Sequence, residues 1–434
     1  MSDMLVIGGG LAGAEAAWAL ARNGFTVTIA EMKPNKFSPA HRSPLLAELV
    51  CSNSLKAERV GSAAGLLKAE MKLLGSLCVR CAVENSVPAG GALAVDRDKF
   101  SQAVTDAIEA EPNITVERRE VTSIPEGCVI VAAGPLASDA LAEDIKRLCS
   151  GTLSFYDAAA PIITAESIDM SRAFTQSRYD RGGGEDYINC PMNREEYELF
   201  YNELVNARSA ELHSFDRKKG VYEGCMPIEV MAARGADTMR FGPLKPVGLR
   251  DPATGHRPWA VLQLRKENAA GTMYNLVGFQ TNLKFGEQKR VFSLIPALKN
   301  AEFVRYGVMH RNTFIDSPRN LSSDFSFKRR EGLYFAGQIT GVEGYMESAA
   351  SGIAAGLNAA RMLKGQEPLN LPDFTMIGAL SSYVSDESVV DFQPMGANFG
   401  ILPPLPEKIR DKKLRYEALA KRSLDWYLSN LNNI

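Results

Sequence analysis

At the start of the chain, short apolar runs alternate with longer stretches whose residue pattern is typical of helices. Residues 4–7 form an apolar run, an alanine-rich stretch extends to about residue 23, and a second apolar run covers residues 26–30. Apolar runs without polar alternation are typical of strands that are buried on both faces of a parallel sheet. The pattern therefore predicts a strand, a helix and a second strand parallel to the first.

Two later segments again combine apolar strands with helical stretches. The first has a helical pattern over residues 96–110, a strand at 114–117 and an apolar strand at 129–134 that ends in small residues and glycine. The second has a strand at 332–338 and a helix of small residues at 348–361, which we expect a neighbouring element to approach closely. Together these pieces predict one doubly wound parallel sheet of the α/β class.

The middle of the chain has a different pattern of apolar and polar residues. Residues 151–310 mix strands and loops and include an alternating run at 259–264, which predicts an inserted α+β domain. The first domain is then discontinuous and consists of residues 1–150 and 311–434. Its tail becomes helical from about Glu407. The residues predicted for the apolar face of this C-terminal helix are Leu414, Leu419, Trp426, Leu428 and Leu431.

The first strand leads into a glycine fingerprint, Gly8-x-Gly10-x-x-Gly13. Gly8 suits the tight turn, Gly10 lets backbone amides approach a pyrophosphate, and Gly13 lets the helix pack closely on the sheet. The free N–H groups and the dipole of the helix N-terminus favour that anion. Glu31 ends the second strand, where a ribose-binding carboxylate belongs. The cofactor-binding residues predicted at the fingerprint are Gly8, Gly9, Gly10, Leu11, Ala12 and Gly13.

The fingerprint occurs once, and late segments return to the same sheet. This combination suits FAD, because so long a dinucleotide needs contacts from several parts of the chain. We therefore expect a Rossmann-like FAD-binding domain of the GR2-type. The sequence has no second strand-glycine-helix unit for a tightly held NAD(P)H, so transient reduction by NAD(P)H is the role left open for that nucleotide. The plain alternative is a glycine-rich turn in an ordinary strand-helix-strand unit.

Charge is nearly balanced, with 49 basic residues, 51 acidic residues and a net charge of −2, so any contact with nucleic acid must come from a local patch. Residues 408–422 form such a patch, with seven basic residues against two acidic ones. It predicts either a phosphate-binding surface or a solvated helix face with paired charges. The candidate phosphate-binding residues are Lys408, Arg410, Lys412, Lys413 and Arg415.

The seven cysteines are an odd number scattered over the chain, which is typical of a reducing compartment and not of a disulfide scaffold. Cys78 and Cys81 have CxxC spacing, but no second pair and no nearby histidines complete a zinc site, so we expect no metal. The sequence has no uninterrupted apolar run of about 18 residues or more, which argues against a membrane span. We expect a cytoplasmic protein.

Two other cysteines have surroundings that a packing cysteine does not need. Cys51 lies in the polar, turn-prone segment 49–56, close in sequence to Lys56. Cys225 lies between a glycine and the turn that contains Pro227. Thiolates near positive charge in loops are typical nucleophiles, and simple packing is the alternative for each.

Six segments together carry a specific resemblance: residues 6–17, 49–56, 223–227, 278–283, 306–313 and 337–345. Over essentially its whole length, the chain resembles the bacterial folate- and FAD-dependent tRNA (uracil-5-)-methyltransferases, the TrmFO family. The fingerprint is generic, whereas the two cysteine segments and those around His310 and Gln338 are specific. Many FAD oxidoreductases carry Asp where Gln338 stands, and this departure fits the resemblance.

The resemblance implies that 5,10-methylenetetrahydrofolate gives one carbon to C5 of the T-loop uridine at tRNA position 54, forming 5-methyluridine. FAD, reduced by NADH or NADPH, supplies the electrons. The resemblance also implies that Cys225 adds to C6 of uracil, that Cys51 is a second thiol near the flavin, and that His310 stacks on the pterin. It makes the basic segment a predicted tRNA-binding surface. The residues implied to contact the flavin are Gly337, Gln338 and Tyr345, the last as a cap.

Three other functions stay open on the sequence. One is the same chemistry on ribosomal RNA, and a second is a flavin oxidoreductase that acts on a small molecule, in which both cysteines are incidental. The third is a non-catalytic RNA-binding protein with a vestigial flavin site. A structural role for His310 and core packing for Tyr345 are the corresponding alternatives for those side chains.

Overall fold

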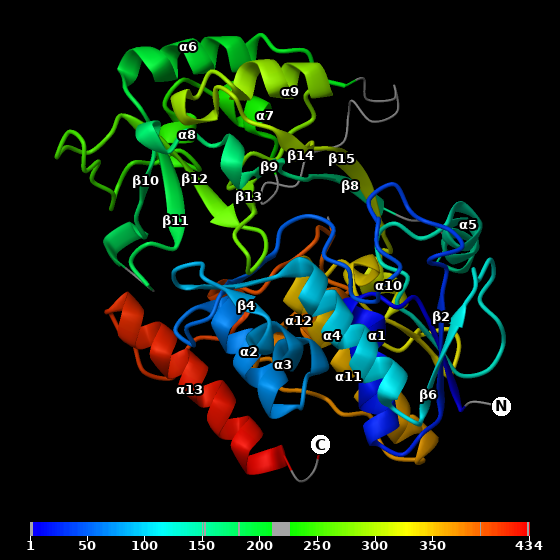
Figure 1. The fold of residues 1–434 in the computed structure, drawn as a ribbon. Coiled ribbons are helices and arrows are strands. Elements are labelled where there is room, and N and C mark those ends of the chain that lie inside the picture. Colours follow the sequence, from blue (N-terminus) through cyan, green and yellow to red (C-terminus); the bar gives the residue numbers. More distant parts are fainter. Residues whose placement is uncertain are drawn as a thin grey trace.

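The structure is a computed structural model that describes residues 3–149, 151, 153–180, 183–210, 226–390, 392–431 and 434. For residues 153–158, 180, 310 and 311 it describes the backbone alone. Figure 1 shows two lobes: the larger one holds both ends of the chain, and the smaller one is formed by the middle of the sequence.

A five-stranded parallel sheet forms the centre of the larger lobe, in the order β16-β7-β1-β2-β6. The strands are β1 (Met4–Ile7), β2 (Val27–Glu31), β6 (Ile114–Arg118), β7 (Val129–Val131) and β16 (Leu333–Phe335). Helix α1 (Leu11–Arg22) is the crossover that the parallel pair β1 and β2 requires. The predicted parallel sheet and the return of late segments to it are confirmed.

Helix α11 (Tyr345–Leu363) crosses α1 at close range. A Cβ at Gly352 would lie 2.2 Å from the carbonyl oxygen of Ala12, so only glycine fits at this crossing. The expected close approach is confirmed, although the helix begins earlier than predicted, because Gly344 makes the preceding turn with a φ of +122°. The other described α-helices of this lobe are α2 (Ala63–Leu73), α3 (Leu77–Glu84), α4 (Arg97–Ala110), α5 (Asp139–Leu148), α10 (Ser317–Asn320), α12 (Met376–Ser385) and α13 (Lys412–Asn430).

The smaller lobe is built on a six-stranded antiparallel sheet in the order β10-β11-β12-β13-β9-β14. Its strands are β9 (Ile162–Thr164), β10 (Phe174–Thr175), β11 (Tyr187–Met192), β12 (Ala260–Lys266), β13 (Met273–Leu276) and β14 (Phe303–Arg305). Its described α-helices are α6 (Arg194–Val205), α7 (Ile228–Ala232), α8 (Thr238–Phe241) and α9 (Phe285–Phe292). The predicted α+β texture and the strand at the alternating run are confirmed.

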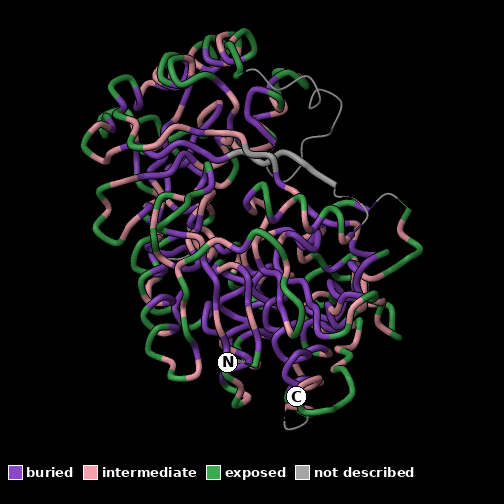
Figure 2. Tube along the Cα trace, turned by 90° about the vertical axis from the view of Figure 1, so that its right-hand side faces the viewer, coloured by how far each residue is buried: buried purple, intermediate pink, exposed green. Residues whose placement is uncertain are grey.

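Two short sheets complete the fold. β8 (Leu153–Ala158) and β15 (Met309–Phe314) form an antiparallel ribbon through which the chain passes into the smaller lobe and back. The other short sheet, in the larger lobe, consists of β3 (Ser54–Ala57), β5 (Ala92–Val95) and β4 (Ser86–Val87). Buried residues form a separate hydrophobic core in each lobe, as the purple regions of Figure 2 show. The exact domain borders at residues 150 and 310 stay predictions.

The C-terminal helix α13 packs against α2 (Figure 1). It begins at Lys412 and not near Glu407, because Asp411 caps it by accepting a hydrogen bond from the Leu414 amide at 2.8 Å. The predicted apolar face is wrong at Leu414 and Leu428, which are 57% and 62% exposed, because the helix meets the lobe along a different stripe. The buried positions of that stripe are Leu419, Ala420, Ser423 and Tyr427. Within the described ranges, no helix is long and apolar enough to cross a membrane.

Candidate active site

The glycine fingerprint forms the turn between β1 and α1. A Cβ at Gly8, whose φ is +101°, would lie 2.6 Å from the carbonyl oxygen of Ala132, and one at Gly13 would lie 1.9 Å from that of Gly8. These two glycines are therefore required by packing. A Cβ at Gly10 would meet nothing within 4 Å, so this position faces open space at the start of α1. That space is where an approaching pyrophosphate meets the helix N-terminus.

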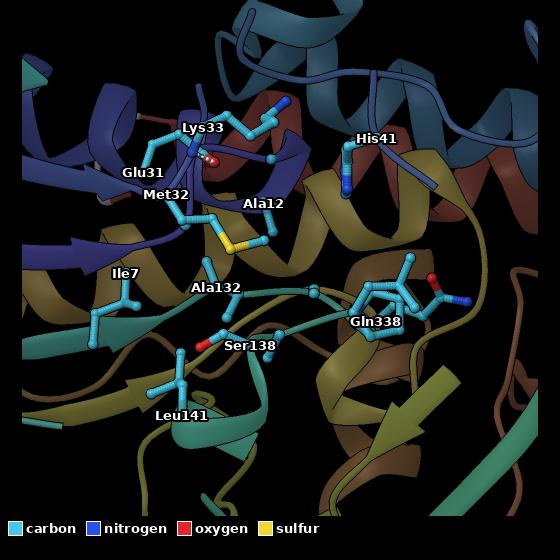
Figure 3. Close-up of a pocket in the computed structure, with 18 of the residues that line it drawn as sticks. Ile7, Ala12, Glu31, Met32, Lys33, His41, Ala132, Ser138, Leu141 and Gln338 are labelled. Atoms are coloured by element: carbon cyan, nitrogen blue, oxygen red, sulfur yellow. Dashed lines mark hydrogen bonds between the residues drawn. The ribbon is translucent and has the colours of Figure 1, made fainter. Parts of the chain in front are cut away.

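Glu31 lies at the end of β2, beside this turn (Figure 3), and is only 6% exposed. Its carboxylate accepts hydrogen bonds from the amide of Gly9 at 2.7 Å and from the amide of Lys33 at 2.9 Å. Each bond uses one carboxylate oxygen, so further lone pairs remain for the hydroxyl groups of a ribose. The predicted position of Glu31 thus coincides with a fixed acceptor at the edge of the cleft.

A cleft with about 1050 Å³ of empty space, its open mouth included, runs along the turn. This is the size of cavity that holds a large organic ligand. Its walls come from the fingerprint, the ends of β2 and β7, the start of α5 and the turn at Gly337. Lining residues that sequence analysis missed are Met32, Lys33, His41, Glu48, Ser138 and Leu141. Most of them lie in loops, where no periodic pattern marks them.

The charges at the Glu31 end of the cleft are largely compensated. Lys33 donates from Nζ to the carbonyl oxygen of Leu45 at 2.7 Å and forms an ion pair with Glu48 at 3.2 Å. Burial and the charge of Lys33 lower the pKa of His41, so this ring is neutral at pH 7. The neutral ring and the paired lysine leave Glu31 as the polar group aimed at a ligand.

The other end of the cleft is formed by Gln338 and Tyr345. Gln338 donates from Nε2 to Glu343 at 2.6 Å, which fixes its amide. The hydroxyl of Tyr345 accepts a hydrogen bond from the Cys51 amide at 2.6 Å. The structure therefore joins the Cys51 segment, which is remote in sequence, to the edge of the cleft.

Arginine side chains hold the Cys51 loop from both lobes. Arg97, the first residue of α4, donates to the carbonyl oxygens of Leu49 and Cys51, the latter at 3.2 Å. The same guanidinium forms an ion pair with Glu267 of the smaller lobe. The carbonyl groups of the loop are thus fixed by a side chain whose own charge is balanced.

Two more arginines reach this loop from the smaller lobe. Arg265, on β12, donates to Asn53 Oδ1 at 2.9 Å and to Ser52 Oγ at 2.7 Å. Arg305, on β14, donates to the carbonyl oxygen of Val50 at 2.5 Å. Among the ion pairs of the described residues, neither of these arginines has a carboxylate partner.

The arginines give the Cys51 loop a positive environment. Arg97, Arg265 and Arg305 each interact electrostatically with the Cys51 thiol. Positive charges near a cysteine stabilise the thiolate. Lys56, which is close in sequence, instead forms an ion pair with Glu347 at 2.7 Å. The three arginines are far apart in the sequence, so no spacing pattern could have found them.

Cys225 lies outside the described residues, as does the side chain of His310. The backbone of His310 belongs to β15, where it pairs with Asp157 of β8. Beyond Met226, Glu229 in α7 accepts hydrogen bonds from the Thr281 hydroxyl at 2.8 Å and the Asn282 amide at 2.7 Å. The structure therefore tests neither the predicted nucleophile nor the predicted pterin contact.

The five basic residues predicted to bind phosphate are all exposed around the start of α13. Lys412, Lys413 and Arg415 fall among the first residues of the helix, whose first turn contains no acidic residue. Cations at this end oppose the helix dipole and each cost about 0.3–1 kcal/mol. Only Lys413 has an ion-pair partner among the described contacts of these three, Glu417 at 3.9 Å. Lys412 and Arg415 lie over the ring of Tyr416, at 5.5 and 5.6 Å, and their exposed charges have no carboxylate partner among the described ion pairs.

Other cysteines are packed in the core. Cys78 and Cys81 are buried on α3, and burial raises the pKa of both thiols, to about 11 for Cys81. These thiols are protonated at neutral pH and unreactive. Within the described part of the chain, no group of three or more His, Cys, Asp or Glu side chains is placed to hold a metal ion.

Comparison with known proteins connects this geometry to a family. The family model described as "Glucose inhibited division protein A" matches residues 3–367. The chain is 60% identical over 421 residues to a methylenetetrahydrofolate--tRNA-(uracil-5-)-methyltransferase TrmFO of Acetivibrio thermocellus, covering 96% of both chains. It is 58% identical to the TrmFO of Listeria innocua, over 97% of this chain and 96% of the relative. The chain belongs to this methyltransferase family.

Solved structures agree on the fold of this TrmFO-family chain. GidA of Aquifex aeolicus superposes with a TM-score of 0.72 in one crystal form and 0.71 in another, at 18% and 17% sequence identity. The match covers 99% of this chain and 76% or 73% of the GidA chain. At this identity the likeness concerns the fold, and it confirms the expected Rossmann-like architecture with its inserted lobe.

Proposed function

We propose that this TrmFO-family chain transfers one carbon from 5,10-methylenetetrahydrofolate to C5 of the T-loop uridine at position 54 of tRNA. The observation that carries the proposal is the hydrogen bond between the Cys51 amide and Tyr345, which brings an arginine-surrounded thiol loop to a nucleotide cleft. The relatives quoted above are named for this activity on tRNA, so we favour tRNA over ribosomal RNA or a small molecule as substrate.

FAD fits the cleft. The open space beside Gly10 leaves room for the pyrophosphate, and the Glu31 carboxylate lies where ribose hydroxyls can donate. We assign the flavin ring to the end formed by Gly337, Gln338 and Tyr345. Reduced FAD supplies the two electrons that convert a methylene group into a methyl group, and NADH or NADPH supplies them to FAD.

The chemistry explains the need for a nucleophilic thiol. C5 of uracil is a weak nucleophile until C6 is attacked. We assign this attack to Cys225: its thiolate forms a C–S bond to C6, and the displaced electron pair makes C5 nucleophilic. C5 then bonds to the methylene carbon of the folate as one of the two C–N bonds of that carbon breaks. Loss of the C5 proton to a base breaks the second C–N bond, which releases tetrahydrofolate and leaves a methylene group on C5. A hydride equivalent from reduced FAD, when bound, would turn this methylene into a methyl group. Breaking the C–S bond restores the thiolate and the double bond of uracil. We assign His310 to stacking on the pterin.

Cys51 is our candidate for the base that accepts the C5 proton. The guanidinium groups of Arg265 and Arg305, which have no carboxylate partner among the ion pairs of the described residues, donate to its loop, and their charge favours the thiolate form. The Tyr345 hydroxyl holds the Cys51 amide, so the loop and the flavin end of the cleft keep a fixed relation.

The tRNA is expected to contact the start of α13. Exposed cations that oppose the helix dipole suit the phosphate backbone. The candidates there remain Lys408, Arg410, Lys412, Lys413 and Arg415. The target base must leave its stacked position to reach the flavin. We place this reaction in the cytoplasm, because tRNA, folate and nicotinamide nucleotides meet there.

The decisive experiment uses tRNA that contains 5-fluorouridine. Because fluorine at C5 cannot leave as a proton, a thiol adduct at C6 should accumulate as a covalent complex. Mass spectrometry of the digested complex should locate the link at Cys225. The Cys225→Ala variant should lose the adduct and 5-methyluridine formation while keeping bound FAD, and a Cys128→Ala variant, which removes another partly exposed thiol, should behave as wild type.

Other outcomes of this experiment reassign the roles. An adduct at Cys51 exchanges the functions of the two thiols. Full methylation by Cys225→Ala excludes Cys225 as the nucleophile. The absence of methylation by the wild-type chain, loaded with FAD and supplied with folate, reductant and tRNA, contradicts the proposed function.

A further inference from the structure

Three aromatic rings form a nearly parallel stack on the smaller lobe. The rings of Phe303 and Tyr306 lie 5.2 Å apart at an interplanar angle of 10°, and those of Tyr306 and Phe285 lie 4.9 Å apart at 17°. Phe303 continues inward to Phe292, which is fully buried, at 6.5 Å. The stack therefore runs from the hydrophobic core of the lobe to its surface.

Phe285 ends this stack and is 55% exposed. Single exposed apolar side chains are common on protein surfaces, so the exposure of Phe285 matters only together with the ordered stack behind its ring. Phe241, on α8 of the same lobe, is 84% exposed and takes part in no ring contact among the described residues. Phe285 differs because a rigid stack holds its ring at a fixed angle.

The stack lies beside an isolated antiparallel bridge between Ser209 and Leu283. The Lys284 amide donates to the carbonyl oxygen of Arg208 at 3.0 Å, and the Ala210 amide donates to that of Asn282 at 2.8 Å. Arg305, next to Tyr306, donates to Val50 in the Cys51 loop. The stack is thus connected to residues 208–210 and to the Cys51 loop.

The charge around the exposed ring is positive. Lys284 precedes Phe285 and Lys289 follows in the same helix, and both are exposed and absent from the ion pairs of the described residues. The nearby carboxylate of Glu287 is already paired with Arg290 at 2.8 Å. An aromatic face with unpaired cations around it complements a base attached to a phosphate backbone.

We propose that the Phe285 ring is a stacking platform for an unpaired base of the RNA substrate. The inference rests on the proposed function, because it takes tRNA as the occupant. A base that stacks on Phe285 continues the existing three-ring stack, and the neighbouring lysines meet its phosphates. The contact holds the RNA on the smaller lobe, at the start of α9, while the target uridine is turned out of the loop.

The test compares three full-length, FAD-loaded variants with wild type: Phe285→Ala, Phe285→Trp and the matched control Phe241→Ala. We expect Phe285→Ala to weaken binding of a tRNA T-arm stem-loop and to raise its KM about 5- to 150-fold. Phe285→Trp should bind like wild type, because it keeps the aromatic face. Phe241→Ala should also bind like wild type.

Two further measurements separate stacking from other causes. The slope of log Kd against log salt should stay unchanged in Phe285→Ala, because stacking releases no counterions. Flavin absorbance and bound FAD should be those of wild type, which excludes misfolding. Wild-type affinity of a folded Phe285→Ala protein overturns the inference. If Phe285→Ala weakens RNA binding but the wild-type chain does not methylate, the platform stands and the proposed function fails.

Discussion

At the scale of the residue, one fingerprint contains glycines of two kinds. Gly8 and Gly13 are required because added side chains would collide with backbone at 2.6 and 1.9 Å. Gly10 collides with nothing in the protein and has an ordinary φ of −71°. The fold itself therefore leaves room for a Cβ atom at residue 10, and we assign the open space there to a ligand.

Gly10→Val should give a folded protein that lacks FAD. The valine side chain would occupy the space that the pyrophosphate needs, and its Cβ would meet no protein atom within 4 Å. Gly91→Val is the matched control, since its Cβ also meets nothing within 4 Å and it lies outside the cleft. Flavin released by heat and separated by chromatography measures binding. Stoichiometric FAD in folded Gly10→Val contradicts the assignment, as does FMN in the wild-type protein.

At the scale of the element, α13 is held to the larger lobe by a buried carboxylate. Glu70 of α2 accepts hydrogen bonds from the amides of Met376 and Ile377, at 2.7 and 2.9 Å, and from the Ser423 hydroxyl at 2.5 Å. One side chain thus satisfies the first amides of α12 and anchors α13. The helix that exposes the basic patch depends on a group far from that patch.

The attachment of α13 should weaken as the pH rises. Burial raises the pKa of Glu70 from its ordinary 4.5 to about 7. The folded state therefore favours the protonated carboxyl, and the stabilisation is complete below pH 4.5 and lost as the pH rises through 7. The shift corresponds to about 3 kcal/mol of unfolding free energy. Thermal unfolding of wild type should show a falling midpoint between pH 5 and pH 8.

Two variants check the origin of this pH dependence. Glu70→Gln cannot titrate, so its midpoint should change less over the same range, although it is less stable at pH 5 because its amide N–H groups face other donors. Glu126→Gln removes a carboxylate that is 95% exposed and should keep the wild-type dependence. An equal fall in all three proteins excludes Glu70 as the cause.

At the scale of the whole molecule, the Cys51 loop is part of the contact between the lobes. Asn53 donates to the carbonyl oxygens of Val95 in the larger lobe and Lys266 in the smaller lobe, both at 2.9 Å. Arg265 of the smaller lobe donates to Asn53 and to Ser52. The inserted lobe therefore contributes charge and position to a thiol that belongs to the other lobe.

Arg265→Gln should make Cys51 less reactive. The glutamine can still donate hydrogen bonds to the loop, but it removes a buried positive charge that favours the thiolate. We expect alkylation of Cys51 by iodoacetamide at pH 7 to slow about tenfold, measured by mass spectrometry, with bound FAD unchanged. Arg172→Gln, at a half-exposed arginine on the same lobe, is the control. An unchanged alkylation rate shows that Arg265 only positions the loop.

The strands, the helices and the glycine fingerprint could be predicted from the sequence alone. The unalternating apolar runs became β1, β2, β7 and β16, and the small residues of α11 did meet α1. These predictions succeed because strand burial, helix periodicity and glycine turns depend on residues close together in the chain. The apolar face of α13 was predicted less well. The spacing of apolar residues along a helix does not show which neighbouring element the helix packs against.

The packing of the two lobes determines which side chains surround the Cys51 thiol and which side chains line the cleft. Arg97, Arg265 and Arg305 converge on one loop from three elements, and the Cys51 amide meets Tyr345, 294 residues further along the chain. The Phe285 stack likewise joins α9 with the end of β14. Such contacts depend on how lobes and loops pack, and pairwise interactions between distant residues leave no spacing pattern in a single sequence.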